Sequence, residues 1–565
     1  RAVDKGANYI SISLKQDGKN NFAFGAQATI YYNNKKQFTE LYPARGFQSS
    51  VDLKINFGLG KQTSIDSLKI KWPDWSVQTI INPKINMLHS ITKEKNLDRE
   101  QTEISTLKTA LSKVEIIGLN KHIENNYVDY DYEVTIPESL SREGPGVAIG
   151  DVNGDGLDDI FLGNAAGYTS ALYLQNKNGS YSILPNKDIE AAKEQEDVVA
   201  LFFDVDQDDD LDLYVGTGGN EDFKGNQVLY DRIYLNDGKG NFSVKKDALP
   251  NIPTNTSVIA PNDFDNDGDI DLFIGNRSVS GIYGITPKSY FLRNDGDAFF
   301  TDVTDSFGKA ASEYGMITDA KWVNFSSDNY KDLLIVGDWI GPTFFSNNGY
   351  SLSKHKTNLE NLKGWWNTII TGDFNNDFLV DFIFGNKGEN TPLTGTELEK
   401  IKLFINDFDL NGNLDKIITI EINGKNYPIS VKKELEHQLP ILRKNTTSYE
   451  IFAKKTVEDL LGENAIKNSI VKTINESKSI LAIQYKNDFQ IKALNDEVQR
   501  NSVNSGISKD IDQDGNLDLL LFGGDDHFKP QFSKQDAGFG ELLFGNGKGD
   551  FRWQPYFKSG LKVKG

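Results

Sequence analysis

Residues 263–275 read Asp-Phe-Asp-Asn-Asp-Gly-Asp-Ile-Asp-Leu-Phe-Ile-Gly, an acidic loop of nine residues followed by an apolar strand that ends in glycine. Further copies of this loop occupy residues 151–159, 204–212, 324–332, 373–381, 407–415 and 510–518. The copy at 324–332 is degenerate. A unit that recurs every ~50–60 residues is typical of repeat architectures in which each unit packs on its neighbours. The repeats therefore decide the fold.

A second pattern follows most copies of the loop. After the loop at 204–212, the strand Arg-Ile-Tyr-Leu at 232–235 runs into the turn Asn-Asp-Gly-Lys-Gly-Asn-Phe at 236–242. Similar turns occur near residues 178–179, 295–296, 348–349 and 546–547. Loop and turn together give about four strands per unit, which is the pattern of a propeller blade. We predict an all-β fold, a β-propeller in which seven blades are favoured and six stay open.

The copy that begins at Asp407 is the reason for two blade counts. It lies much closer to its predecessor at Asp373 than to its successor at Asp510. Its loop could join strands three and four of the preceding blade instead of opening a blade of its own.

The propeller is predicted to span residues 141–565. Residues 1–95 show short alternating strands separated by Gly, Asn and Pro turns, which indicates a small β-domain. Residues 96–140 are polar and charged and are interpreted as a linker. Apolar residues at helical spacing, interrupted by Pro440 and ending at Gly462, predict a helical insertion at about residues 430–475.

The loop chemistry favours calcium. Oxygen-bearing side chains stand at loop positions 1, 3, 5 and 9, and position 7 can offer a backbone carbonyl, so one loop can surround one ion. All of these ligands are hard oxygens without His or Cys, which favours calcium over zinc or copper. Glycine at position 6 permits a sharp turn. Phe378 and Asp209 replace that glycine in two copies, and Phe378 is costly there if its φ is positive.

The loops differ in the number of carboxylates that they offer. The second, third and seventh carry four at the ligand positions, the first, fifth and sixth about three, and the fourth only Asp328 and Asp332 beside Asn324 and Ser326. We expect the fourth to be empty. The predicted metal ligands are Asp151, Asn153, Asp155, Leu157 and Asp159; Asp204, Asp206, Asp208, Asp210 and Asp212; Asp263, Asp265, Asp267, Asp269 and Asp271; Asp373, Asn375, Asp377 and Asp381; Asp407, Asp409, Asn411, Asn413 and Asp415; and Asp510, Asp512, Asp514, Asn516 and Asp518. The predicted cofactor is therefore Ca²⁺, several ions per chain, in a structural role.

Composition narrows the function classes. The formal net charge of −20 disfavours nucleic acid and anionic membrane as partners. The chain has no cysteine, which excludes disulfides and zinc–thiolate sites in this stretch. No apolar run approaches the ~20 residues of a membrane-spanning helix. Because the chain begins at Arg1 and enters a strand almost at once, we interpret it as part of a longer protein whose anchor lies outside this stretch.

Two families resemble parts of this sequence. The acidic loops followed by strands that end in glycine are similar to the FG-GAP/VCBS repeats of integrin α-subunit propellers, over about residues 146–555. The first domain resembles an ASPIC/UnbV domain, on the strength of the segments 20–26 (Asn-Asn-Phe-Ala-Phe-Gly-Ala), 45–50 (Arg-Gly-Phe-Gln-Ser-Ser), 57–60 (Phe-Gly-Leu-Gly) and 72–74 (Trp-Pro-Asp). Similar domain pairs occur in cartilage acidic protein and in large surface proteins of Bacteroidota. The resemblance implies an extracellular or cell-surface location, in the outer membrane of a Gram-negative bacterium.

Two functions follow as hypotheses. The first is a calcium-stabilised scaffold that binds a protein partner, such as an outer-membrane nutrient transporter complex, without enzymatic activity, since no catalytic constellation or cofactor fingerprint is found. The second is a glycan-binding module or glycan-active enzyme of a polysaccharide-utilisation system, in which Trp75, Trp339, Trp365 and Trp366 would stack on sugars. The pair His122 and Glu124 is noted, with an ordinary surface role as its interpretation.

Overall fold

The computed structural model describes residues 6–99, 109–221, 229–326, 328–532 and 534–563. The chain divides into two compact units, residues 1–107 and 108–565, which are described separately. None of the helices within the described ranges is long and apolar enough to cross a membrane.

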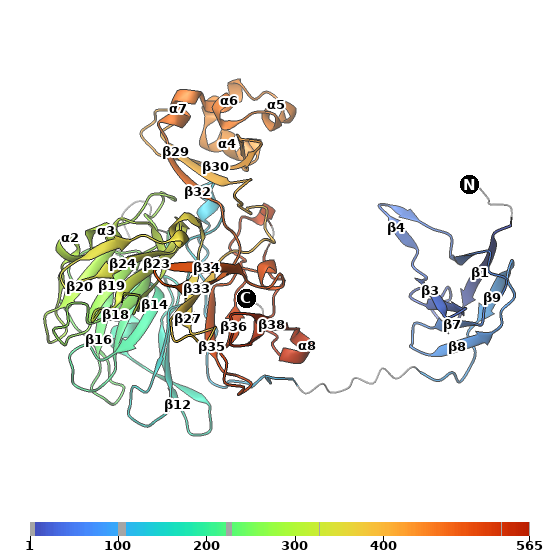
Figure 1. Cartoon of the computed structure of the whole chain (residues 1–565), viewed down its shortest axis with the longest axis horizontal. Coiled ribbons are helices and arrows are strands. Elements are labelled where there is room, and N and C mark those ends of the chain that lie inside the picture. Colours follow the sequence, from blue (N-terminus) through green and yellow to red (C-terminus); the bar gives the residue numbers. More distant parts are fainter. Residues whose placement is uncertain (1–5, 100–108, 222–228, 327, 533, 564–565) are drawn as a thin grey trace. The chain divides into compact units, whose positions relative to one another are not determined.

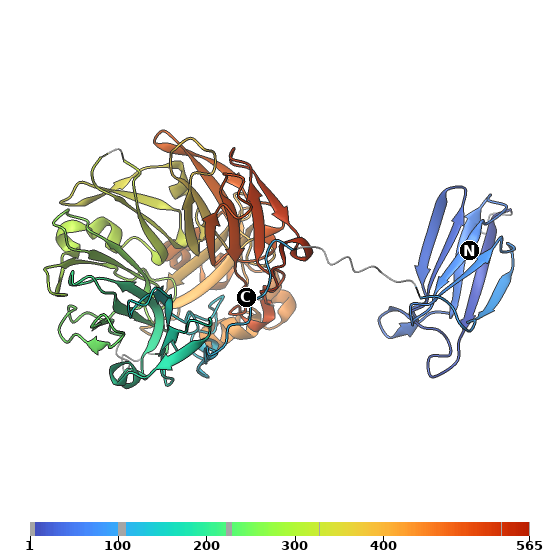
Figure 2. The same ribbon diagram turned by 90° about the horizontal axis from the view of Figure 1, so that it is seen from below.

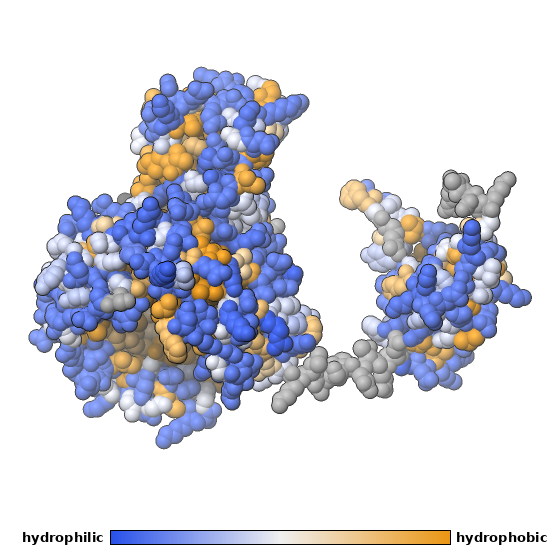
Figure 3. All heavy atoms as spheres, in the orientation of Figure 1, coloured by the Kyte–Doolittle hydropathy of each residue, from blue (hydrophilic) through white to orange (hydrophobic). Residues whose placement is uncertain are grey.

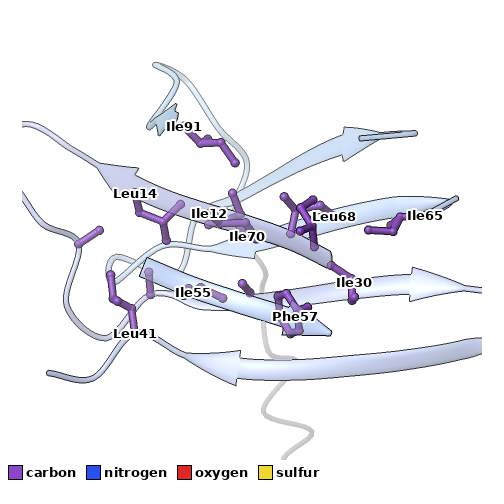
Figure 4. Close-up of a cluster of buried hydrophobic side chains, with 14 of the residues drawn as sticks. Ile12, Leu14, Ile30, Leu41, Ile55, Phe57, Ile65, Leu68, Ile70 and Ile91 are labelled. Atoms are coloured by element: carbon purple, nitrogen blue, oxygen red, sulfur yellow. The ribbon is translucent and has the colours of Figure 1, made fainter. Parts of the chain in front are cut away.

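The first unit consists of two small sheets with a shared core. One sheet has the order β6-β1-β9 and the other β3-β2-β7-β8, beside the short hairpin β4-β5. The strands are β1 (Asn8–Lys15), β2 (Gln27–Tyr32), β3 (Lys35–Glu40), β4 (Ala44–Gly46), β5 (Ser49–Ser50), β6 (Lys54–Gly60), β7 (Ser67–Lys71), β8 (Val77–Ile81) and β9 (Leu88–Thr92). Alternate residues of β6 and β7 are buried, as expected for strands with one face on a core. Ile12, Ile30, Phe57 and Ile70 meet between the sheets (Figure 4).

The second unit is a ring of four-stranded antiparallel sheets (Figures 1 and 2). Within the described residues, six sheets follow the blade pattern, each with an acidic loop between its first and second strands. Their strands, in sheet order, are β10 (Val147–Gly150), β11 (Asp159–Leu162), β12 (Ala171–Gln175), β13 (Tyr181–Leu184); β14 (Glu196–Phe203), β15 (Asp212–Gly218), β16 (Arg232–Leu235), β17 (Ser243–Val244); β18 (Thr256–Asn262), β19 (Asp271–Asn276), β20 (Tyr290–Asn294), β21 (Phe300–Asp302); β22 (Met316–Val323), β23 (Asp332–Ile340), β24 (Thr343–Asn347), β25 (Leu352–His355); β27 (Thr368–Gly372), β28 (Asp381–Gly385), β33 (Ile480–Tyr485), β34 (Asp488–Ala493); and β35 (Ser505–Lys509), β36 (Asp518–Phe522), β37 (Glu541–Gly545), β38 (Phe551–Gln554). The all-β propeller with four-stranded units is confirmed.

The Asp407 copy belongs to a separate sheet inserted between β28 and β33. This sheet has the order β31-β30-β29-β32, and the acidic loop joins β29 (Ile401–Asn406) to β30 (Asp415–Ile422). The other two strands are β31 (Lys425–Pro428) and β32 (Ile470–Ile474). The alternative that the loop joins strands three and four of the preceding blade is therefore wrong. The described residues hold six sheets of the blade pattern and one inserted sheet, and the number of blades stays a prediction.

Short helices lie mostly outside the blades. The helical segment expected at about residues 430–475 contains α4 (Lys432–Gln438), α5 (Tyr449–Ala453), α6 (Val457–Leu461) and α7 (Glu463–Lys467), and it ends in β32. These helices lie beside the inserted sheet (Figure 1) and share with it a cluster of buried apolar side chains. The remaining helices are α1 (Lys187–Ala191), α2 (Thr304–Phe307), α3 (Lys309–Ser312) and α8 (Tyr556–Ser559), and the short strand β26 (Gly364–Trp365) pairs with β23.

The propeller core is divided among the interfaces between consecutive sheets. Five buried clusters each combine side chains of two neighbouring blades, from the first and second to the fifth and sixth. The glycine that ends each second strand permits this contact. A Cβ at Gly275 would lie 2.5 Å from Val258 Cγ1 and 2.9 Å from Ile317 Cγ2, on the first strands of its own and the next blade. That glycine signature is therefore a packing requirement.

Residues 109–143, which we call the strap, cross the propeller without regular structure apart from a short 3-10 helix at Asp129–Asp131. The strap overlaps the segment 96–140 interpreted as a linker, of which residues 100–108 are outside the described ranges. It is held by backbone hydrogen bonds, in which Leu111 N donates to Ser559 O (2.8 Å), Tyr181 N to Ile117 O (2.7 Å) and Lys529 N to Pro137 O (3.0 Å). The described part of this segment is thus packed against the blades.

The strap ends at the propeller axis in a network of buried ion pairs. Arg277 contacts Glu143 and Asp338, each at 2.7 Å, and Lys387 contacts Asp525 at 2.6 Å as well as Glu138. Residues beside the first strands of the blades line a cavity of about 220 Å³ around these charges. Ion pairs of this kind hold buried charges in place because an unpaired buried charge is costly.

Three of the four tryptophans proposed for sugar stacking belong to the core. Trp339, Trp365 and Trp366 are 3%, 2% and 0% exposed. Their assignment as sugar platforms is wrong, because a stacking surface must be open to solvent. Trp75, in the first unit, is 57% exposed.

We predict that Trp366→Ala destabilises the propeller by about 3–5 kcal/mol, the cost typical of removing a buried aromatic side chain. Tyr350→Ala is the matched control, since Tyr350 is an aromatic residue of the same unit with 86% exposure. It should change the free energy of unfolding by about 0.5 kcal/mol at most. Urea denaturation followed by intrinsic fluorescence measures both. Equal destabilisation by the two variants would contradict the assignment of Trp366 to the core.

Candidate metal centre

The acidic loops that begin with aspartate are each folded around that first carboxylate. In the third loop, Asp263 Oδ1 accepts a hydrogen bond from Asp267 N at 3.1 Å and Oδ2 accepts one from Gly268 N at 3.0 Å. The aspartates that open five further loops accept the same two bonds from positions 5 and 6: Asp151, Asp204, Asp373, Asp407 and Asp510. This curl brings the alternate positions of the loop to one side.

The curl requires left-handed backbone conformations at two positions. Position 6 has φ of 104° at Gly268 and 69° at both Asp209 and Phe378, so the strain expected for Phe378 is present. Position 4 is also left-handed, with φ of 62° at Asn266 and 59° at Leu410. Sequence reasoning missed this second position, although the Asn, Gln and Gly found there in most copies were a usable signal.

The last aspartate of each loop ties it to the body of the blade. Asp271 is fully buried, and its carboxylate accepts Phe264 N at 3.0 Å and Asn294 N, at the end of the third strand, at 2.8 Å. Equivalent pairs of bonds are made by Asp159, Asp212, Asp332, Asp381 and Asp518. Position 9 is thus a structural anchor as well as a candidate ligand.

The residue that donates this bond from the third strand also links neighbouring blades. The Asn294 side-chain amide donates to the carbonyl of Val205, position 2 of the preceding loop, at 2.9 Å. Asn236 and Asn347 make the same bond to Val152 and Phe264, at 2.8 and 2.9 Å. The acidic loops and the turn signature therefore form a hydrogen-bonded belt that runs from the first to the fourth blade.

Four loops gather three carboxylates closely enough to share one ion. Ligand oxygens lie within 4.8 Å of one another in each of four groups: Asp204, Asp206 and Asp212; Asp263, Asp265 and Asp271; Asp407, Asp409 and Asp415; and Asp510, Asp512 and Asp514. At position 3, Oδ1 of Asp206, Asp265 and Asp409 is buried without a hydrogen-bond partner. A buried carboxylate oxygen without a partner is costly unless a cation satisfies it. These residues fit calcium, for which they would supply hard oxygen ligands.

The remaining predicted ligands are placed less closely. Asn153 and Asn375 occupy position 3 in the first and fifth loops, whose aspartates do not form such a group of carboxylates among the described residues. At position 7, the backbone N–H groups donate to position 5 at 2.8–3.1 Å, and the side chains stand outside the groups: Leu157, Asp210, Asp269, Asn413 and Asn516. The Asp269 carboxylate instead accepts Gln207 Nε2 of the neighbouring loop at 2.6 Å.

The fourth loop is satisfied by its own side chains. Ser326 donates its backbone N–H and its hydroxyl to Asp332 Oδ2, each at 2.6 Å, and Asp328 accepts Tyr330 N at 3.0 Å. Residue 327 lies outside the described ranges. A serine hydroxyl therefore provides the contact that a cation would otherwise make, which agrees with the expectation that this loop is empty.

The electrostatics of the grouped carboxylates also favour a cation. Burial, only partly offset by backbone N–H groups, raises the pKa of Asp212 and Asp271 to about 7 and that of Asp415 to about 6. The pKa of Asp265 is raised by burial and then by the charge of Asp267. A bound divalent cation would reverse these shifts, because it favours the charged form of each ligand.

Comparison with known proteins identifies both parts of the chain. Residues 16–98 match the family described as ASPIC and UnbV, and residues 151–215 and 204–274 match the FG-GAP-like repeat. The resemblances to these two families are confirmed, and together they indicate an extracellular or surface β-propeller protein. No curated protein matches the chain.

Two solved structures resemble the chain distantly. An Agrocybe aegerita lectin that recognises non-reducing terminal N-acetylglucosamine is 14% identical, with a TM-score of 0.30, over 74% of this chain and 98% of the lectin. The V. cholerae biofilm matrix protein Bap1 is 11% identical, with a TM-score of 0.30, over 74% of this chain and 80% of its own. Likenesses at this level carry no argument about function.

We predict that chelation of calcium lowers the melting temperature of the propeller and that added calcium restores it, because the free energy of metal binding is part of the folding free energy. Differential scanning calorimetry in chelator and in millimolar calcium checks this. Asp265→Asn, which removes a ligand of the third loop, should reduce the calcium-dependent shift. Asp328→Asn in the fourth loop is the control and should leave the shift unchanged. A melting curve that does not respond to chelator would contradict the prediction.

We also predict opposite pH dependences with and without calcium. Without calcium, the pKa values near 7 of Asp212 and Asp271 exceed the unfolded value of 3.8, so the folded state binds more protons between these limits. Its stability therefore falls as pH rises through about 7 and is greater at pH 5.5 than at pH 8. In saturating calcium, protons compete with the ion, so stability falls on acidification. Melting temperatures across this pH range in both buffers test the reversal of sign.

Proposed function

We propose that this protein is a calcium-stabilised extracellular scaffold that binds a protein partner through its inserted sheet, as a cell-surface component associated with an outer-membrane nutrient transporter. The observation that carries the proposal is an apolar surface at the end of that sheet which bears the acidic loop. The proposal keeps a binding role over catalysis, because most aspartates of the propeller are already engaged in the frames of the loops.

The apolar surface consists of residues from the loop and from β32. Leu410 and Leu414 of the loop are 87% and 40% exposed, and Ile470 and Val471 of β32 are 50% and 47% exposed. Ile470 pairs with Ile405, which lies near the end of β29 that leads into the acidic loop. The four side chains therefore belong to the same end of the sheet. Figure 3 shows hydrophobic side chains gathered around the inserted sheet on an otherwise mostly hydrophilic face. Apolar side chains exposed together at one end of a sheet favour an interaction site there.

Leu410 adds an observation of a different kind. Its φ of 59° is a conformation that costs a branched side chain about 1–2 kcal/mol and that asparagine or glycine would tolerate. A strained, exposed leucine gains nothing for the isolated fold. Strain of this type concentrates at functional positions, where the side chain is used in binding.

Calcium would control the order of this surface. Leu410 stands directly after Asp409, whose Oδ1 is buried without a hydrogen-bond partner, and Asp407, Asp409 and Asp415 form one of the close carboxylate groups. An ion held by these residues fixes the backbone that presents Leu410 and Leu414. The extracellular setting suits this arrangement, because weak calcium sites are filled at ~10⁻⁴–10⁻³ M, the range of extracellular modules.

A glycan-binding role is the second candidate, now supported by Trp75 alone among the four tryptophans. Trp75 is 57% exposed, has φ of 69°, and lies under Lys71 Nζ at 4.2 Å from the ring centroid. Loss of a glycan-array signal on Trp75→Ala would favour this candidate over the scaffold.

We predict that Leu410→Gly weakens capture of the partner while it stabilises the fold. Glycine adopts the positive φ without strain, which should stabilise the fold by up to about 1 kcal/mol after the greater conformational entropy that glycine loses on folding is subtracted. It also removes the apolar side chain from the surface. The measurement is affinity capture from outer membranes in calcium and in chelator, with mass spectrometry for the transporter encoded beside the gene of this protein. The transporter should be retained in calcium by the parent protein and lost in chelator.

Phe378→Gly is the matched control for that variant. Phe378 has the same kind of strained φ, 69°, and is 96% exposed, but it lies in the loop of the fifth blade. It should gain stability in the same way and keep the partner. Equal capture by the parent protein and by Leu410→Gly would place the partner elsewhere, and absence of the transporter in calcium would reject the association.

A further inference from the structure

Three glutamates from separate segments meet outside the acidic loops. Glu124 belongs to the strap, Glu196 begins β14, the first strand of the second blade, and Glu221 follows β15 of the same blade. The Asn125 side-chain amide donates to Glu221 Oε1 at 2.6 Å and to Glu196 Oε2 at 3.3 Å, so the two carboxylates face the same amide. His122 Nε2 contacts Glu124 Oε1 at 2.5 Å.

Each of these carboxylates leaves one buried oxygen without a hydrogen-bond partner. The atoms are Glu124 Oε2, Glu196 Oε1 and Glu221 Oε2. Glu196 is only 1% exposed, so water cannot solvate its free oxygen from the surface. A buried carboxylate in this condition is destabilising unless it gains a proton or a cation.

Among the described residues, no lysine or arginine supplies that compensation to Glu196 or Glu221. Neither Glu196 nor Glu221 forms an ion pair with any lysine or arginine of the described residues, whereas the carboxylates at the propeller axis are paired with Arg277 and Lys387. Consistently, burial and then the charge of Glu221 raise the pKa of Glu196 to about 10. Hard carboxylate oxygens without His or Cys ligands favour a cation of the calcium class.

We propose that Glu124, Glu196 and Glu221 bind a divalent cation, with calcium as the fitting ion, at a site separate from the repeat loops. The three glutamates are not among the groups of described residues whose ligand atoms all lie within 4.8 Å. Binding therefore draws the partly exposed Glu124 and Glu221 toward the buried Glu196. The space beside Gly219 helps, because a Cβ there would lie 2.3 Å from Glu221 Oε2 and 3.4 Å from Glu196 Oε2.

The site would fasten the strap to the second blade. Next to Glu124, the strap is otherwise held by hydrogen bonds, such as Ile123 N donating to Asn164 Oδ1 at 3.1 Å. An ion that joins Glu124 to β14 and to the segment after β15 would crosslink parts of the chain that are about 70 and 100 residues apart. The chain closed by this crosslink is much longer than the chain closed by an ion within a nine-residue repeat loop. Calcium would then act on the strap independently of the loop belt.

Equilibrium dialysis with radioactive calcium tests the site on the whole chain. Glu196→Gln should bind one ion fewer than the parent protein, or bind that ion at least about tenfold more weakly, since a charged ligand is lost. Glu221→Gln, at a partly exposed position, should show the same loss of calcium binding. If Glu196→Gln does not fold, the result for Glu221→Gln tests the site alone. Glu541→Gln, at a half-buried carboxylate of the sixth blade, is the control and should bind the parent number of ions.

Hydrogen exchange supplies the local readout. Calcium should increase the protection of the Ile123 amide about tenfold or more in the parent protein and in Asp265→Asn, but not in Glu196→Gln or Glu221→Gln. Unchanged calcium binding and unchanged protection in both glutamate variants would overturn the proposal. So would a Glu196→Gln variant that is more stable and binds the parent number of ions, because Glu196 and Glu221 would then share a proton and not a metal.

Discussion

The carboxylate at the ninth position of each acidic loop is the constraint on which the propeller depends. Asp271 is fully buried and accepts hydrogen bonds from its own loop and from the third strand of its blade, and the residue that donates the second bond reaches the loop of the preceding blade. One side chain thus joins loop, blade and neighbour. A charged group is suited to this task because bonds to a carboxylate are stronger than bonds to a neutral acceptor.

This design has an electrostatic consequence. A buried carboxylate surrounded by others is charged only at a cost, which the raised pKa values of Asp212 and Asp271 express. Under the proposed function, bound calcium would remove this cost and add binding free energy, which would link the stability of the propeller to the ion. The fourth loop shows the other solution, in which Ser326 satisfies Asp332 by hydrogen bonding alone. At the propeller axis, the same problem is solved by Arg277 and Lys387. The glutamates around Glu196 have neither solution within the described residues.

The inserted sheet differs from the blades in its packing, and the proposed function assigns recognition to it. Its loop keeps the ligand pattern of the repeats, but the sheet lies between the second and third strands of the fifth blade and carries its own helices. Because it is not packed between two blades as the other sheets are, its residues are free to expose Leu410, Ile470 and Val471. A module that shares the ion chemistry of the propeller without its packing constraints is well placed to bind a partner.

The sequence by itself determined the fold class, the two families, the loop frames and the residue types of the ligands, because these depend on local spacing: alternate oxygens in a nine-residue loop and a glycine after each second strand. It did not determine the place of the Asp407 loop, since spacing along the chain does not reveal which strands pair. The sequence also could not distinguish buried tryptophans from exposed ones, and their burial excludes Trp339, Trp365 and Trp366 as surfaces for sugar stacking. Only the tertiary structure brought Glu124, Glu196 and Glu221 together, because their meeting depends on the path of the strap across the blades and on no repeated local pattern.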